Sequence, residues 1–461
     1  MTKFAHRITT VEEIPRIVAL GFRTAVASPP GPVLLDFPID ILFSPPQRSM
    51  ISWGSIKRPL PLPAGPNAES VKQVIDALQH AERPAIVVGT GARGQECAQE
   101  LVKFAETHNL PVFNSSKFST SFPIDHPLRS GMATRMAYLS HIGQKHVDLI
   151  ILIGARTGFL LGGRDGAVIP NQDVKLIQID VDGSEIGRSH PVDVGVVSDA
   201  TQALIALNAA ASSSAKKASD EWVKVATGLK SLASPFEKAP LEESPGRAHP
   251  YHAVKAVFES LEPGAIVCMD GGEAGCWAQD LVETTARASL YMVCTGYLGF
   301  LGNGWGYALG AAVAEPGKQV INIQGDGSAC FHVEELDTYS RHNLNILSVV
   351  VNNYCWGMSK SGQILVYGGI TGARPVSQLS PKTDFSVVAQ GFGATGAKVN
   401  KVEDVPAAVK KLSNAPGPGC IDLIVNDEPI HPVTKSMVGD YNENEIRVPY
   451  YTNIPRAYYK T

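Results

Sequence analysis

A short glycine-rich run around one aspartate has the composition of a binding site for a metal-bound diphosphate. The run reads Gly325-Asp326-Gly327-Ser328, and the pair Asn352-Asn353 follows further along the chain. Glycines on both sides of Asp326 let the main chain turn tightly and bring its N–H groups close to an anion. Mg2+ binds about six oxygen atoms, and carboxylate and amide oxygens are suitable ligands. Asp326 and Asn353 are therefore the natural ligand pair.

Both halves of this motif follow apolar segments that are typical of β-strands. Residues 319–324 precede the aspartate, and residues 346–351 precede the asparagines. Neighbouring parallel strands end at the same edge of a sheet, so this arrangement would bring residues 326 and 353 together. A structural alternative is a helix-capping aspartate and a strand-ending turn with no ligand.

Gly-Asp-Gly followed at this interval by Asn-Asn resembles the thiamine diphosphate motif of the decarboxylase and carboligase superfamily. The resemblance implies that Mg2+ is held by Asp326, Asn353 and the main-chain carbonyl of Cys355. It also implies a set of cofactor-binding residues in the C-terminal part of the chain: Gly271, Gly272, Gly299, Leu301, Gly325, Asp326, Gly327, Ser328, Asn353, Cys355, Trp356 and Gly357.

Two of these positions lie outside the Gly-Asp-Gly and Asn-Asn segments and have their own sequence context. Leu301 lies in Gly296-Tyr297-Leu298-Gly299-Phe300-Leu301-Gly302. In the family, a large apolar residue here supports the bent conformation of the cofactor, and the flanking glycines suit close approach of a planar group. Asp270-Gly271-Gly272 follows an earlier strand-like segment and resembles the loop that contacts the other end of the cofactor. Packing in the core is the structural alternative for Leu301.

The bulk composition describes an ordinary globular chain with a small-molecule partner. Its 461 residues are 44% hydrophobic and 18% charged, with a formal net charge of −4. This charge gives no basic surface for nucleic acid or an anionic membrane, and no apolar run is long enough to span a bilayer. The seven cysteines form no CxxC spacing, which predicts neither a disulfide framework nor a zinc site. We expect a cytoplasmic protein.

The periodicity predicts an α/β fold with two parallel-sheet domains. The family resemblance implies that the middle domain is Rossmann-like, that the C-terminal domain binds the diphosphate, and that the first residues are the remnant of a pyrimidine-binding domain. Strand-like segments such as 85–88, 149–153 and 176–179 alternate with helical patterns in the middle part. Proline-rich and Ala/Ser/Lys-rich segments separate the domains. The predicted divisions are 1–43 (remnant of a pyrimidine-binding domain), 44–67 (linker), 68–207 (middle domain), 208–249 (linker), 250–435 (C-terminal domain) and 436–461 (tail).

The first 43 residues are too few for a domain of their own. Thr10 to Glu13 predicts a capping box before a helix, and residues 31–38 predict one buried strand. One helix and one strand cannot bury a core. The resemblance implies that the chain begins near the end of a pyrimidine-binding domain and lacks the glutamate that activates the cofactor. We therefore expect cofactor binding and no catalytic side chain within this sequence.

The middle part contains Gly89-Thr90-Gly91-Ala92-Arg93-Gly94 after a predicted strand, which is a literal dinucleotide-binding pattern. The acidic residue expected about twenty positions later is missing, since the chain there reads Pro111-Val112-Phe113-Asn114. A structural turn is the favoured interpretation. Arg156 and Asp180 lie where FAD- or ADP-binding relatives contact a nucleotide, and a salt-linked loop explains them equally well.

Several segments resemble benzaldehyde lyase-like carboligases, including Gly154-Ala155-Arg156 and Trp356-Gly357. This implies a lyase or carboligase acting on 2-hydroxy ketones, aldehydes or 2-oxo acids, and a homodimer or homotetramer when complete. Acetolactate synthases and 2-hydroxyacyl-CoA lyases share much of the pattern and remain alternatives. A non-catalytic thiamine diphosphate-binding subunit and one chain of a two-chain enzyme are further alternatives.

Overall fold

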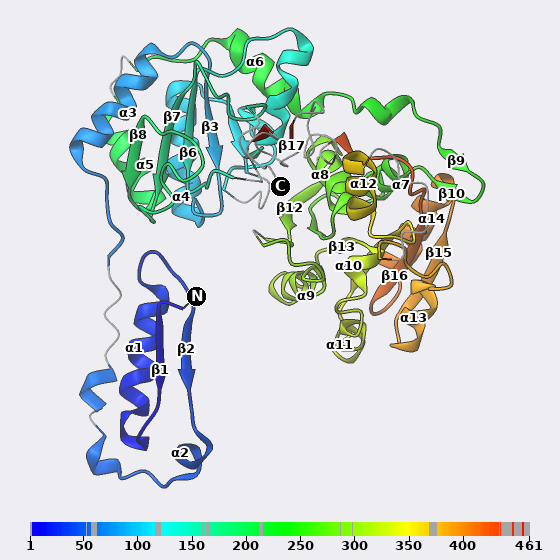
Figure 1. The fold of residues 1–461 in the computed structure, drawn as a ribbon, viewed down its shortest axis with the longest axis horizontal. Helices are drawn as coiled ribbons and strands as arrows, with labels where there is room; N and C mark the ends of the chain where they lie inside the picture. The colour runs from blue at the N-terminus through cyan, green and yellow to red at the C-terminus, as the bar shows by residue number, and fades with distance from the viewer. Residues whose placement is uncertain are drawn as a thin grey trace.

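The computed structural model contains two parallel sheets and a separate N-terminal segment (Figure 1). No described helix is both long and apolar enough to cross a membrane. The structure describes residues 2–51, 53–56, 62–115, 121–158, 161–162, 166–211, 215–285, 287–296, 298–367, 376–432, 434, 445–446 and 454–455.

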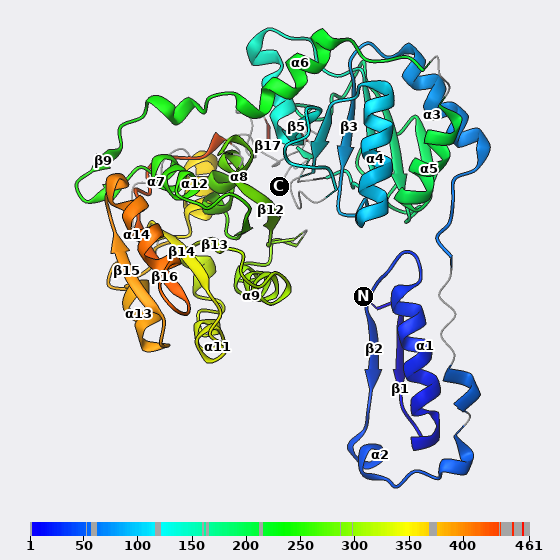
Figure 2. The ribbon, with the colours of Figure 1, turned by 180° about the vertical axis from the view of Figure 1, so that it is seen from behind.

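The middle unit is a six-stranded parallel sheet in the order β5-β4-β3-β6-β7-β8. Its central strands are apolar along their whole length because helices and loops cover both faces. Helix α4 lies in front of the sheet in Figure 2, with α5 beside it. The strands are β3 (Pro84–Val88), β4 (Val112–Asn114), β5 (Arg129–Met132), β6 (Leu149–Ile153), β7 (Lys175–Asp180) and β8 (Val194–Val197), and the helices are α3 (Ala68–His80), α4 (Gln95–His108), α5 (Ala200–Ala210) and α6 (Asp220–Gly228).

The C-terminal unit is a second six-stranded parallel sheet, in the order β12-β11-β13-β14-β16-β15. Alternate residues of one strand enter two different cores: Ile266 and Cys268 pack with α9, whereas Val267 and Met269 pack with α7, α8 and α14. The strands are β11 (Ala265–Met269), β12 (Ala288–Val293), β13 (Val320–Gly325), β14 (Ile346–Asn352), β15 (Thr395–Val399) and β16 (Gly419–Ile424). The helices are α7 (Pro250–Glu259), α8 (Glu273–Thr285), α9 (Gly304–Ala314), α10 (Asp326–Ala329), α11 (Glu335–Arg341), α12 (Gly357–Tyr367), α13 (Phe385–Gly391) and α14 (Val405–Ser413).

A buried ion pair joins the two units. Arg129 of β5 donates from Nε to Glu283 Oε2 at 3.0 Å and from Nη2 to Glu283 Oε1 at 2.5 Å. The hydroxyl of Tyr291 on β12 donates to the same carboxylate at 2.5 Å. All three side chains are buried. Because Glu283 belongs to α8, this helix forms the seam between the units.

The N-terminal segment is a small unit of two parallel strands and two helices, which Figure 1 shows apart from both sheets. Its elements are β1 (Phe4–Arg7), α1 (Ile14–Val26), β2 (Val33–Asp36) and α2 (Ile39–Phe43). Large apolar side chains such as Phe22, Leu34 and Phe43 are exposed there. The short remaining strands are β9 (Glu242–Ser244), β10 (Arg247–Ala248), β17 (Glu445–Ile446) and β18 (Ile454–Pro455).

Two sequence-based expectations are wrong in detail. Thr10 forms no side-chain cap; Glu13 instead accepts hydrogen bonds from the N–H and hydroxyl of Thr9, at 2.5 and 2.9 Å. The strand predicted over residues 31–38 is shorter and alternates between half-buried and exposed positions. Part of the predicted linker 208–249 is α6, whose Trp222 and Ala226 pack into the core of the middle unit. The predicted tail 436–461 lies outside the described residues except for β17 and β18.

Candidate functional site

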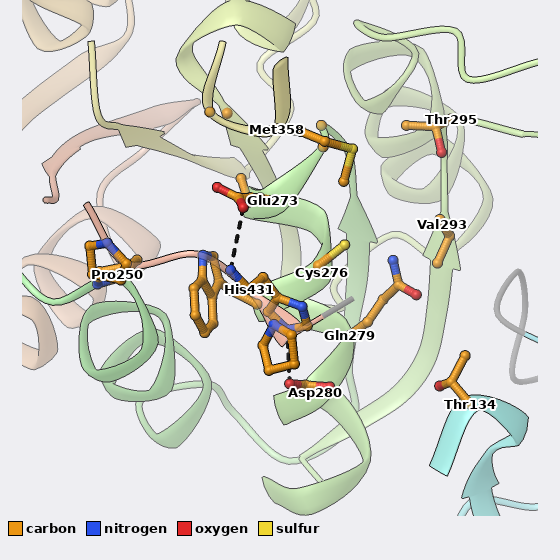
Figure 3. A pocket seen from close by; sticks show the side chains of 18 of the residues that line it. Thr134, Pro250, Glu273, Cys276, Gln279, Asp280, Val293, Thr295, Met358 and His431 are labelled. Carbon is orange, nitrogen blue, oxygen red and sulfur yellow. Dashed lines mark hydrogen bonds and ion pairs between the residues drawn. The ribbon is translucent and has the colours of Figure 1, made fainter. Parts of the chain in front are cut away.

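A cavity of about 820 Å3 lies at the carboxyl ends of β11, β13 and β14, where parallel α/β sheets usually bind ligands. Helix α8 forms one wall, and residues of the middle unit complete the other side (Figure 3). Every residue that we predicted for the cofactor lines this one cavity: Gly271, Gly272, Gly299, Leu301, Gly325, Asp326, Gly327, Ser328, Asn353, Cys355, Trp356 and Gly357.

The two predicted metal ligands converge because their strands are neighbours. Strands β13 and β14 are paired in parallel, with Gly325 opposite Val351. Asp326 Oδ2 and Asn353 Oδ1 both accept hydrogen bonds from the N–H of Cys355, at 3.1 and 3.2 Å. Tyr354 has φ of +59°, and this left-handed residue turns the chain so that the N–H faces back toward the two oxygens. The geometry therefore brings a carboxylate and an amide oxygen to one point.

Asp326 has the electrostatic character of a cation ligand. Burial raises its pKa to about 7, although the N–H groups of Gly327 and Cys355 partly offset this. No group of three or more His, Cys, Asp or Glu side chains that could hold a metal occurs among the described residues. A buried carboxylate with N–H donors but no cationic partner among its recorded contacts fits a site that a bound metal ion would complete. Burial also raises the pKa of the Cys355 thiol to about 12, so only the main chain of Cys355 suits a hard metal.

Two glycines in this region are required by close contacts of the folded chain. A Cβ at Gly327 would lie 2.6 Å from the ring of Trp356. A Cβ at Gly357 would lie 2.8 Å from Asn353 Nδ2. Either methyl group would push the Asp326 or Asn353 segment away from its position. This part of the cavity therefore depends on glycine for its shape.

Leu301 is half-buried and lines the cavity next to the aspartate loop. The N–H of Gly302 donates to Ser328 Oγ at 3.1 Å, which fixes the Leu301 segment to the loop that follows β13. The neighbouring side chains of Leu298 and Phe300 are exposed, at 81% and 62%. Leu301 thus faces the cavity while the residues beside it face outward.

Asp270 organises the loop at the end of β11. It is fully buried, and its Oδ2 accepts from the N–H of Gly304 at 2.6 Å while Oδ1 accepts from the N–H of Gly271. Gly271 has φ of +100°, which favours glycine. The carboxylate therefore joins the Gly271-Gly272 loop to the start of α9, and these two hydrogen bonds fix the position of the loop that lines the cavity.

Sequence reasoning missed a polar cluster on α8. Glu273 Oε1 accepts from the N–H of His431 at 3.3 Å, and His431 Nε2 lies 2.9 Å from Asp280 Oδ2 (Figure 3). The imidazole packs edge-on against Trp277 with ring centres 4.5 Å apart. Burial raises the pKa of Glu273. Glu273 directly follows Gly272 and could have been suspected from that position, whereas the sequence carries no signal that pairs Asp280 with His431.

The glycine-rich turn of the middle unit is packed against its own chain. A Cβ at Gly89 would lie 2.3 Å from the carbonyl oxygen of Gly154, and one at Gly91 would lie 2.7 Å from the Cα of Gly154. These contacts explain the glycines without a dinucleotide and agree with the structural interpretation of this motif. Arg156 pairs with Glu185 at 3.2 Å, as in the salt-linked alternative. Burial raises the pKa of Asp180, whose Oδ1 accepts from the N–H of Asp182.

Comparison with known proteins identifies the family. Residues 71–207 match the thiamine pyrophosphate enzyme central domain, and residues 270–423 match the thiamine pyrophosphate enzyme C-terminal TPP binding domain. The acetolactate synthase large subunit of Corynebacterium glutamicum is 30% identical over 442 residues, which cover 93% of this chain and 68% of that protein. The chain belongs to the thiamine pyrophosphate enzyme family. The predicted family is therefore confirmed, and its relatives are enzymes.

Other relatives of this thiamine pyrophosphate enzyme have similar names and coverage. Probable acetolactate synthase 2, chloroplastic, of Oryza sativa is 30% identical over 445 residues, or 92% of this chain and 65% of that protein. The chain thus spans about two thirds of the length of these relatives. A solved benzoylformate decarboxylase from Polynucleobacter necessarius has the same fold, with a TM-score of 0.71, 22% identity, and coverage of 93% of this chain and 77% of that one. The predicted α/β fold with two parallel sheets is confirmed.

Proposed function

We propose that this protein binds thiamine diphosphate through Mg2+. We further propose that it forms part of a lyase or carboligase enzyme that acts on 2-hydroxy ketones, aldehydes or 2-oxo acids. One observation carries the proposal. The side-chain oxygens of Asp326 and Asn353 meet at the N–H of Cys355, inside a cavity that also contains the Gly271-Gly272 loop and Leu301.

One set of residues in the cavity would bind the metal ion, and a second set would bind the diphosphate. Asp326, Asn353 and the carbonyl of Cys355 would hold Mg2+, which accepts such oxygen ligands together with phosphate oxygens. The main-chain N–H groups of Gly272, Ser328 and Gly357 would bind the diphosphate. The N–H groups of Gly271, Gly327 and Trp356 already donate to Asp270, Asp326 and Ser377, so these residues and Gly325 would line the diphosphate side without donating to it. Helix α12 begins at Gly357, and the positive end of its dipole favours an anion there.

The remaining predicted residues shape the part of the cavity beyond the diphosphate. Leu301 presents an apolar side chain beside Gly299, and both would contact the rings of the cofactor. When bound, thiamine diphosphate supplies a carbon nucleophile for addition to a carbonyl group. The protein contributes position, an apolar surface and exclusion of water around the reacting atoms.

A second candidate is acetolactate synthase activity, which the names of the 30% identical relatives favour. A 2-hydroxyacyl-CoA lyase and a non-catalytic cofactor-binding subunit are the other candidates. We also propose a homodimer or homotetramer as the working form. The exposed Phe300, Val313 and Phe331 near the cofactor region support this, because large exposed apolar side chains often lie in interfaces.

The first experiment measures cofactor binding. Thiamine diphosphate with Mg2+ should raise the melting temperature of the protein, and either component alone should raise it much less. Asp326→Ala should remove the joint effect, whereas Asp337→Asn on the exposed side of α11 should keep it. Equal stabilisation of the wild type and Asp326→Ala would refute the metal site. Assays with benzaldehyde, pyruvate and a 2-hydroxyacyl-CoA would then separate the candidate activities.

A further inference from the structure

The cavity extends from the cofactor loops to a second polar end on the middle unit. Thr134, Arg135, Tyr138 and Ser140 line this end, and they belong to the segment that follows β5. Asp280 of α8 faces them. It lies seven residues after Glu273, and a helix rises about 1.5 Å per residue, so this end is roughly 10 Å along α8 from the Gly271-Gly272 loop.

Arg135 is the distinctive residue of this second end. Its side chain is only 9% exposed. Nη2 donates to the main-chain oxygen of Asp280 at 2.9 Å, and the guanidinium lies over the ring of Tyr138, 5.6 Å from its centre. Within the described part of the chain, Nη1 and Nε of Arg135 have no hydrogen-bond partner. Neither atom is among the enclosed polar atoms that lack a partner, so solvent or a ligand in the cavity can reach both donors.

The carboxylate of Asp280 does not fill that role. Its Oδ1 is 3.7 Å from Arg135 Nη2, which is beyond a good hydrogen bond, while its Oδ2 is 2.9 Å from His431 Nε2. Burial acts to raise the pKa of Asp280, but the neighbouring His431 and Arg135 side chains together outweigh burial and lower it. Asp280 is therefore ionised, and its carboxylate contacts His431 more closely than Arg135. The Nη1 and Nε donors of Arg135 stay available to a ligand in the cavity.

We infer that Arg135 is a specificity-determining residue that binds a carboxylate on the part of the substrate remote from the reacting carbonyl. This inference rests on the proposed function, because it assumes that the carbonyl reacts at the cofactor end of the same cavity. Arg135 is the one Lys or Arg among the described lining residues, which suits a single carboxylate better than a phosphate dianion. The preferred substrate class is thus 2-oxo dicarboxylic acids and related carbonyl compounds with a distal acid group.

The test compares two probes of equal chain length. 2-Oxoglutarate carries a distal carboxylate, and 2-oxopentanoate has a methyl group in its place. Calorimetric titration of the protein in Mg2+ without thiamine diphosphate avoids any reaction, and a second series includes the cofactor. The wild type should bind 2-oxoglutarate about tenfold more tightly than 2-oxopentanoate, as expected for one charge-assisted contact.

Variants make the assignment specific. Arg135→Gln should reduce the preference to within about twofold, and Arg135→Lys should keep part of it. Asp280→Asn should increase the preference, because a neighbouring negative charge is removed. Arg188→Gln, an exposed arginine paired with Glu185, serves as the matched control and should leave the preference unchanged.

Three outcomes would overturn the inference. The first is equal affinity for both probes in the wild type, with or without cofactor, and the second is a preference that survives in Arg135→Gln. Absence of binding by either probe to the cofactor-loaded protein would also overturn it. The melting-temperature experiment with thiamine diphosphate and Mg2+ is independent of Arg135. Failure of the distal-acid site is therefore distinguishable from failure of the proposed function.

Discussion

The two six-stranded sheets both present glycines where a central strand ends, yet these glycines serve different purposes. In the C-terminal unit, Gly325 and Gly327 flank Asp326, a buried carboxylate that faces a cavity. In the middle unit, Gly89 is pressed against the carbonyl of Gly154, and the chain itself fills the space. A glycine-rich strand end therefore indicates a ligand only when an unneutralised polar group and an open cavity accompany it.

The largest expected difference between the sheets concerns strand-end asparagines. Asn353→Leu should weaken binding of thiamine diphosphate with Mg2+ about a hundredfold, because a metal ligand is lost. Asn114→Leu removes the buried asparagine that ends β4 in the middle sheet and should leave this affinity unchanged. Titration calorimetry measures both. Equal losses in the two variants would contradict the difference that we draw between the sheets.

The buried charge of Asp326 should also affect stability without the cofactor. Burial raises its folded-state pKa from 3.8 to about 7, so the folded protein binds this proton more tightly than the unfolded chain. Stability from this group therefore falls as pH rises from about 4 to about 7 and is then level. Asp326→Asn should stabilise the cofactor-free protein at pH 8 by on the order of 2 to 4 kcal/mol, and by much less at pH 4.

Urea unfolding of the wild type and Asp326→Asn at the two pH values measures this effect. The same variant should lose the stabilisation by thiamine diphosphate and Mg2+. A variant that is less stable than the wild type at pH 8 would show that Asp326 is already neutralised within the folded chain.

Substitution of the crowded Gly89 should have effects opposite to those of Asp326→Asn: it should lower stability and leave cofactor binding intact. Gly89→Ala should lower the free energy of unfolding by about 2 to 3 kcal/mol, because the added Cβ meets main-chain atoms that cannot move independently. Affinity for thiamine diphosphate should stay within about twofold. Gly94→Ala is a matched control in the same turn: its Cβ would meet nothing within 4 Å, and only its φ of +96° carries a cost, about 1 kcal/mol. Thermal melting and cofactor titration would be done on both variants.

The smallest expected effect concerns the salt-linked loop of the middle unit. Arg156→Gln removes a partner of Glu185, but the Arg156 side chain is 46% exposed, and Arg188 also pairs with that carboxylate. We expect a loss below about 1 kcal/mol in unfolding free energy. Titration with ADP or FAD should give no heat with either protein. Binding that depends on Arg156 would revive the nucleotide alternative.

Sequence reasoning recovered the central strands and failed at the edges. Strand β14 is mostly apolar and is buried throughout, so its boundaries were predicted almost without error. Edge strands β8 and β15 mix exposed and half-buried residues, and their pattern resembles that of a loop. Asp326 and Asn353 were predicted to meet because parallel pairing alone brings strand ends together.

The distal end of the cavity could not be predicted in this way. Arg135, Asp280 and His431 come from three segments of the chain that are separated by more than a hundred residues. The fold of the C-terminal unit pairs Asp280 with His431, and the packing of the two units adds Arg135. No spacing rule connects such residues. Their grouping depends on how α8 lies against the middle unit, and this orientation is a property of the tertiary structure.

The buried contact of Arg129 with Glu283 and Tyr291 limits how this protein can be taken apart. Expressed alone, either unit would present an unpaired charge on a surface adapted to exclude water. Helix α8 carries the Glu283 end of this contact and begins beside the Gly271-Gly272 loop. Exchange of the middle unit for one from a relative would thus need a matching arginine, because α8 both begins at the Gly271-Gly272 loop and carries the glutamate that contacts the middle unit.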